Sequence, residues 1–148
     1  MMPPSLSQEA MKSRLSALWT FVLVNMLFAD IFSFMVPGAL QKIATGVVDG
    51  VQLTPGFLLL AAVLTEIPMA MIILSRLLSY RANRWANMLG GVFTSLWVVG
   101  LGSATPHYIF IASVEVICSG CIVWLAWLWR APEGQQRKDV AVTFATGD

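Results

Sequence analysis

The sequence predicts an all-α fold, a membrane-embedded antiparallel four-helix bundle with both termini in the cytoplasm. The chain of 148 residues is 57% hydrophobic and only 11% charged, with mean hydropathy +0.75. Soluble domains carry about 25% charged residues. The apolar residues also gather in stretches of about 20, the length that crosses a bilayer as a helix. We therefore expect a single transmembrane domain over residues 1–148.

Four apolar stretches define the expected spans, at about residues 15–36, 55–78, 85–103 and 106–129. The second and fourth open with Thr54-Pro55 and Thr105-Pro106, a capping hydroxyl followed by proline at the first helical position. The connection over residues 37–54 has apolar residues at helical spacing interrupted by glycines, which favours a short helix lying on the membrane surface. Residues 131–148 are mixed and polar, which predicts a flexible tail.

The basic residues set the expected orientation. With four spans, every lysine and arginine except Lys42 falls on the side of the termini: Lys12, Arg14, Arg76, Arg81, Arg84, Arg130, Arg137 and Lys138. The positive-inside rule then places both termini in the cytoplasm of a multi-pass protein of the cell membrane. Aromatic residues near the same boundary predict an interfacial belt: Trp19, Tyr80, Trp85, Trp124, Trp127 and Trp129.

Three carboxyl side chains lie inside the apolar stretches. Glu66 falls near the middle of its span, and Asp30 and Glu115 fall nearer the outer face. An acid at bilayer depth costs about 2.5–3.5 kcal/mol on the insertion scale, and by default it marks a functional site. We expect these acids and the mid-span Asn25 to point into the bundle, above an inner half that is apolar down to the arginines. On the fourth span Glu115, Cys118, Ser119 and Ile122 share one face.

This pattern leaves three functional readings open. In the first, Asp30, Glu66 and Glu115, with Asn25, form a proton relay or bind a small cationic or polar solute, as in proton-coupled transport. In the second, the protein is a non-catalytic scaffold or accessory subunit whose acids hydrogen-bond between helices. In the third, Cys118-Ser-Gly-Cys121 is a thiol redox pair, although no second cysteine pair exists to relay electrons. The sequence carries no catalytic constellation or cofactor motif, so we expect a protein that is not an enzyme.

Two further groups of residues bear on partners. His107 stands at the outer mouth, as an interfacial histidine or a pH-sensitive group. It is about 12 Å from Glu115 along a helix, so the two cannot share a metal ion, and no metal site is expected. The inner loop carries Arg76, Arg81 and Arg84, which predicts contact with anionic lipids or, alternatively, a specific anion or partner site. A chain this small builds little cavity alone, so we expect a homo-oligomer in the lipid bilayer. The net charge of +1 lacks the excess of basic residues typical of proteins that bind nucleic acid.

Several motifs together resemble a known family. They are Asn25-Met-Leu-Phe-Ala-Asp30-Ile-Phe, Glu66-Ile-Pro68, Ser75-Arg76, Asn83-Arg84-Trp85-Ala-Asn87 and Glu115. Over about residues 13–130 the chain resembles a family of short bacterial four-span integral membrane proteins of unknown function. The resemblance implies four spans, and it implies no activity, cofactor or site residue.

Overall fold

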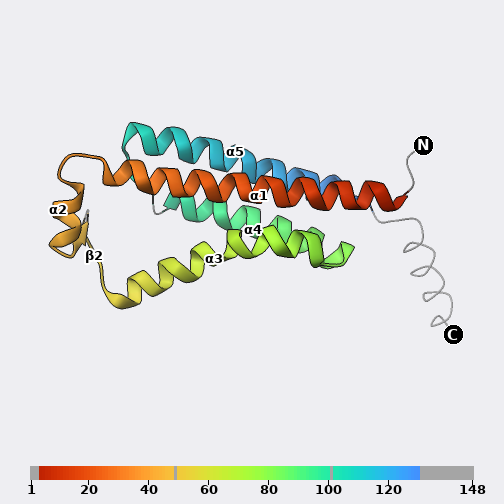
Figure 1. Ribbon diagram of the computed structural model, residues 1–148, viewed down its shortest axis with the longest axis horizontal. Helices are drawn as coiled ribbons and strands as arrows, with labels where there is room; N and C mark the ends of the chain where they lie inside the picture. The colour runs from red at the N-terminus through yellow and green to blue at the C-terminus, as the bar shows by residue number, and fades with distance from the viewer. Residues whose placement is uncertain (1–3, 49, 101, 131–148) are drawn as a thin grey trace.

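The computed structural model describes residues 4–48, 50–100 and 102–130 and is built from long helices (Figure 1). The elements in chain order are α1 (Pro4–Phe34), α2 (Ala39–Ala44), β1 (Val47–Val48), β2 (Val51–Gln52), α3 (Pro55–Leu77), α4 (Tyr80–Gly100) and α5 (Pro106–Leu128). The prediction of an all-helical chain is confirmed. The expected tail, residues 131–148, lies outside the described residues.

Helices α3 and α5 begin at the predicted Thr-Pro pairs. The Oγ1 of Thr54 accepts a hydrogen bond from the backbone N–H of Phe57 at 3.1 Å, which caps α3. Helix α4 differs from the predicted third span, because it begins at Tyr80 rather than near residue 85 and ends at Gly100 rather than near 103. Its first turns are polar, and the sequence suggested a loop there. They are helical because Asn83 and Asn87 find hydrogen-bond partners inside the fold.

The connection after α1 contains a short helix, as predicted, followed by a turn of a different kind. Val47 and Val51 do not continue α2, and they lie instead in a small antiparallel hairpin in which Val47 pairs with Gln52 and Val48 with Val51. Gly46 and Gly50 adopt φ values of 75° and 84°, a left-handed conformation that glycine reaches without strain. The helix therefore stops before Gly46, although the apolar residues continue at helical spacing to Val51.

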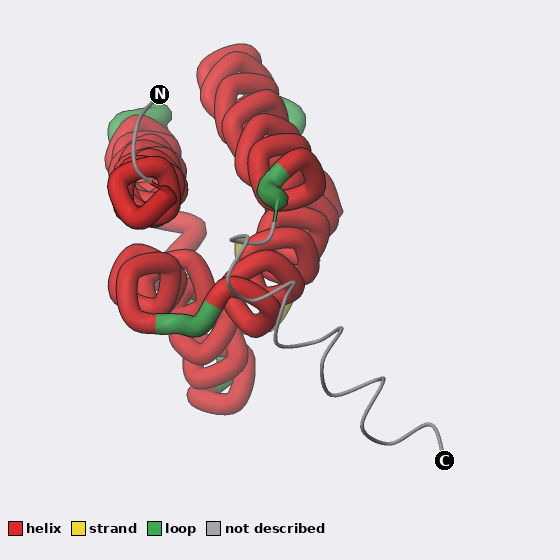
Figure 2. Tube along the Cα trace, turned by 90° about the vertical axis from the view of Figure 1, so that its right-hand side faces the viewer, coloured by secondary structure: helices red, strands yellow, loops and turns green. Residues whose placement is uncertain are grey.

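The four long helices run antiparallel in succession. We call the end where α1 begins, α3 turns into α4 and α5 ends the terminal end, and the opposite end, with α2 and the strands, the hairpin end. Helix α1 packs against α3 and α5, and α4 packs against the same two helices, so α1 and α4 lie diagonally opposite (Figure 2). Figure 1 also shows α3 diverging from α1 toward the hairpin end.

Within the described residues, three helical segments are long and apolar enough to cross a membrane: Gln8–Phe34 of α1, all of α3 and all of α5. A soluble protein would have to bury such segments in its core, yet most of their residues lie on the surface. The chain is therefore a membrane protein. Helix α4 is not among these segments, because its first two turns carry arginines and asparagines.

The buried core lies toward the terminal end and contains Leu15, Trp19, Val22, Met71, Ile122 and Trp129. Trp19 is fully buried and Trp129 nearly so, so the prediction that both belong to an interfacial belt is wrong. Trp85, Trp124 and Trp127 are exposed, as such a belt requires. Trp19 can be buried because its indole N–H has a hydrogen-bond acceptor on α4.

Candidate functional site

A buried network of amide and hydroxyl groups ties three helices together near the terminal end. We call Trp19, Ser75, Asn83 and Asn87 the amide network. The Oδ1 of Asn87 accepts hydrogen bonds from Trp19 Nε1 at 2.7 Å and from Ser75 Oγ at 3.1 Å. Its Nδ2 donates to the backbone oxygen of Asn83 at 2.8 Å and to Asn83 Oδ1 at 2.6 Å. The expectation that this half of the bundle is apolar is therefore wrong.

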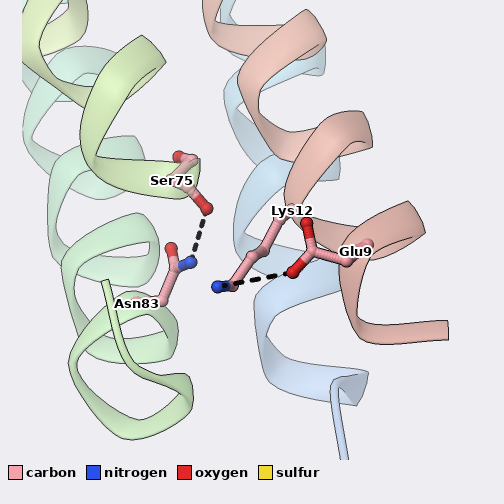
Figure 3. Close-up of polar contacts among 4 residues, drawn as sticks. All are labelled: Glu9, Lys12, Ser75 and Asn83. Atoms are coloured by element: carbon pink, nitrogen blue, oxygen red, sulfur yellow. Dashed lines mark hydrogen bonds and ion pairs between the residues drawn. The ribbon is translucent and has the colours of Figure 1, made fainter. Parts of the chain in front are cut away.

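Asn83 also closes the end of α3. Its Nδ2 donates to the backbone oxygen of Ser75 at 2.6 Å (Figure 3). The last four carbonyls of a helix have no partner within the helix, so a side-chain donor from α4 stabilises this end. Figure 3 also shows Lys12 paired with Glu9 on α1, at 3.8 Å, at the same end of the molecule.

The predicted inner-loop arginines have different surroundings. Arg76 is exposed, and its Nε donates to Ser16 Oγ at 3.2 Å. Arg84 donates to the backbone oxygen of Trp127 at 3.1 Å, and its guanidinium lies 5.9 Å from the centre of that indole. Arg81 is exposed. Arg76 and Arg84 thus bind groups of the bundle itself, and α5 ends against Arg84.

Glu115 is the centre of a second polar cluster, between α4 and α5. Glu115, Thr94 and Ser119 are 3%, 2% and 1% exposed. Their side-chain oxygens Glu115 Oε1, Thr94 Oγ1 and Ser119 Oγ have no hydrogen-bond partner within the part of the chain that the structure describes. Burying a polar oxygen without a partner is unfavourable, and such atoms usually bind a ligand or an ordered water molecule. The predicted polar face of the fourth span is confirmed for Glu115, Ser119 and Ile122, which are all buried.

The register of α4 and α5 brings Thr94 to the level of Glu115. A Cβ added at Gly91 would lie 3.1 Å from the backbone oxygen of Ser119. Thr94 and Glu115 are each one turn from this contact toward the hairpin end, since the two helices are antiparallel. Further toward that end, Tyr108 Oη donates to the backbone oxygen of Val98 at 3.2 Å, which fits the same register.

Asp30 and His107 lie between this cluster and the hairpin end. Asp30 is exposed, so the expectation that it points into the bundle is wrong for the single chain, and Glu115 alone of the three acids is buried. Ser33, one turn beyond Asp30 on α1, has its Oγ 3.5 Å from His107 Nε2. We call this series the polar column, which consists of Ser33, His107, Asp30, Tyr108, Glu115, Thr94 and Ser119.

A pocket of about 220 Å³ lies at the mouth of the polar column. Ser33, His107 and Thr105 line it from α1 and α5, and Lys42 lines it from α2. The Oγ1 of Thr105 is 3.4 Å from His107 Nε2. His107 is therefore at an opening on the hairpin end.

Glu66 lies on α3, outside the polar column. It is exposed, and on α3 it lies nearly opposite the buried face formed by Pro68, Met71 and Ser75. The expectation that Glu66 points into the bundle is wrong for the single chain. Pro68 packs against the neighbouring helices, and because Glu66 lies on the opposite face of α3, its side chain points outward.

Asn25 hydrogen-bonds within its own helix. It is half-buried, and its Nδ2 donates to the backbone oxygen of Phe21, one turn earlier on α1, at 3.0 Å. The contact of Ser33 with His107 sets the register of α1 against α5, and this register brings Asn25 to about the level of Glu115. Its amide is thus satisfied locally while lying near the cluster.

The cluster around Glu115 has the chemistry of a proton or small-cation site. A carboxyl and two hydroxyls supply oxygens that accept hydrogen bonds or coordinate a hard cation. Among the described residues no group of three or more His, Cys, Asp or Glu could hold a metal ion. Cys118 and Cys121 are free thiols.

The sequence missed Thr94 and the partners of Asn83 and Asn87. A signal for the asparagines was their spacing of four residues, which places both on one face of a helix. Thr94 gave no signal, since a single threonine in an apolar helix commonly bonds its own backbone.

Comparison with known proteins adds a family and no activity. Residues 6–135 match the family described as a family of unknown function, DUF6326. Searches of curated proteins and of solved structures found no match. The match spans nearly the whole chain and covers all the motifs that carried the resemblance. The chain therefore belongs to the family of unknown function DUF6326.

Proposed function

We propose that the protein crosses the cytoplasmic membrane of a bacterial cell four times, with α4 as the additional span and both termini inside. Helix α4 packs along α5 and is 21 residues long, enough for about 30 Å. The basic residues support the orientation. Arg76 and Arg84 lie at the terminal end and Lys42 lies at the hairpin end, which the positive-inside rule assigns to the outside.

We propose that this membrane protein binds a proton, or a small cationic or polar solute coupled to it, at Glu115. The observation that carries the proposal is the set of three buried oxygens without partners, on Glu115, Thr94 and Ser119. A purely structural cluster would satisfy its own hydrogen bonds, as the amide network does. The polar column supports access from the hairpin end, because Ser33 and His107 line the pocket and His107 lies two turns from Glu115 along α5.

The proposal is tested with the purified full chain in liposomes that contain a pH-sensitive dye. A potassium diffusion potential drives protons inward, and we expect proton uptake above that of protein-free liposomes. Glu115→Gln should abolish the difference, since the amide cannot release a proton. Glu66→Gln is the matched control, because it changes an acid of another helix outside the polar column, and it should leave the uptake unchanged.

A second measurement reports binding without transport. The infrared carboxyl band of the protein is followed as the pH is changed, and the part lost in Glu115→Gln belongs to Glu115. A wild-type protein with neither proton uptake nor a titrating Glu115 band would contradict the proposal.

A structural scaffold is the alternative function. The effect of Glu115→Leu on the stability of the bundle distinguishes it from proton binding. If Glu115 holds helices together, Glu115→Leu should destabilise the bundle. If Glu115 is a binding group without a structural partner, the same change removes a buried unpaired oxygen, so stability should be retained or increased while proton uptake is lost. Unfolding in mixed micelles measures the stability of Glu115→Leu relative to the wild-type protein.

A further inference from the structure

Glu66 presents an acid to the middle of the membrane on a surface that no other helix of the chain covers. It is the twelfth residue of the 23-residue helix α3 and lies on the face turned away from α1 and α4. Among the described residues no hydrogen bond or ion pair reaches its carboxyl. Lipid tails cannot supply a hydrogen-bond partner, so a polar group outside the single chain must do so.

Helix α3 is also the least covered of the three apolar helices. Only 11% of its most apolar window is buried in the chain, compared with 28% for each of α1 and α5. The face around Glu66 carries Ala62 and Ala70 one turn away on either side, and both are exposed. Small residues on either side of a polar one let a second helix approach closely enough for hydrogen bonding.

We propose that this face of α3 is the contact between two copies of the chain, which hydrogen-bond to each other through Glu66. Two copies inserted in the same direction have their Glu66 side chains at the same depth, and a two-fold axis along the membrane normal brings them face to face. A protonated carboxyl is both donor and acceptor, so two of them satisfy each other. A lipid-facing surface needs no acid, and a second copy supplies the missing partner without any other protein.

Cysteine cross-linking tests the contact while keeping Glu66 intact. In the full chain with Cys118→Ala and Cys121→Ala, a single cysteine is introduced by Ala62→Cys or Ala70→Cys, and the purified protein in liposomes is oxidised. We expect disulfide-linked dimers from at least one of these variants. Leu89→Cys is the control, because Leu89 is 65% exposed near the middle of α4 and lies away from the proposed contact.

The role of Glu66 itself is tested by adding Glu66→Leu or Glu66→Gln to the same proteins. Glutamine also donates and accepts, so it should keep the dimer, whereas leucine should weaken dimerisation about 5- to 30-fold, measured by dilution in liposomes. Cross-linking no stronger than at Leu89 would overturn the contact on α3. An unchanged dimer with Glu66→Leu would overturn the role of the acid, and a purified protein that stays monomeric would overturn the second copy as the partner.

Discussion

Trp19 of α1 and Asn87 of α4 join two diagonally opposite helices, with the indole Nε1 2.7 Å from the amide Oδ1. Both side chains are fully buried. The same Oδ1 accepts a hydrogen bond from Ser75 of α3. One asparagine oxygen therefore fixes the relative positions of three helices, in a region where lipid and water offer no substitute.

Asn87→Leu is expected to destabilise the bundle strongly. It leaves the Trp19 N–H and the Ser75 hydroxyl buried without an acceptor, at about 1–3 kcal/mol for each group. We expect the free energy of unfolding to fall by about 2–6 kcal/mol, measured by denaturation in mixed micelles. Asn25→Leu is the control. Its amide donates only to its own helix, so a loss below about 1 kcal/mol is expected. Equal losses would contradict the role of Asn87 between helices.

Two glycines of the α4–α5 region should respond oppositely to alanine. A Cβ at Gly91 would lie 2.7 Å from Val123 Cγ2 and 3.1 Å from the backbone oxygen of Ser119, so the helices must move apart. Gly91→Ala should lower the free energy of unfolding by about 1–3 kcal/mol. Gly120 has open space around its Cα, so Gly120→Ala should be neutral or slightly stabilising. Thermal unfolding of the two variants in the same detergent tests whether Gly91→Ala is the less stable.

The two Thr-Pro starts should differ although their sequences match. Thr54 Oγ1 accepts the Phe57 N–H, and Thr105 makes no such capping bond. Thr54→Ala should therefore lower stability by about 1 kcal/mol. Thr105→Ala should have a smaller effect on unfolding. A larger effect at Thr105 would mean that its contact with His107 is the more important one.

Arg84→Ala is expected to loosen the end of α5. The change removes the hydrogen bond to the backbone oxygen of Trp127 and the contact with its ring. A loss of about 1–2 kcal/mol is expected in the unfolding measurement. Arg84→Lys keeps the positive charge that favours the cytoplasmic side, but it lacks the planar guanidinium group that contacts Trp127. It should recover only part of the loss, and full recovery would show that charge alone is needed.

The sequence was sufficient for elements whose signals are local. Thr-Pro pairs begin α3 and α5 where predicted, and the spacing of Glu115, Ser119 and Ile122 identified a buried face. These signals depend on capping and on helical periodicity, both of which act within a few residues.

The direction of Glu66 and the packing of α4 could not be read in this way. In a membrane helix both the lipid-facing and the bundle-facing residues are apolar, so composition does not identify the inner face. The polar start of α4 suggested a loop, because the groups that satisfy Asn83 and Asn87 lie on α3 and α1, distant in sequence. Thr94 became a candidate only when the register of α4 against α5 was known.

The amide network has a consequence for motion. Parts of a protein open with free energies that follow the contacts they must break. At the terminal end, opening would separate Trp19 and Ser75 from Asn87, whereas at the hairpin end α3 already diverges from α1. The contacts between helices are therefore stronger at the terminal end than at the hairpin end. For a solute at Glu115 to cross to the terminal side, the hydrogen bonds of the amide network would first have to break.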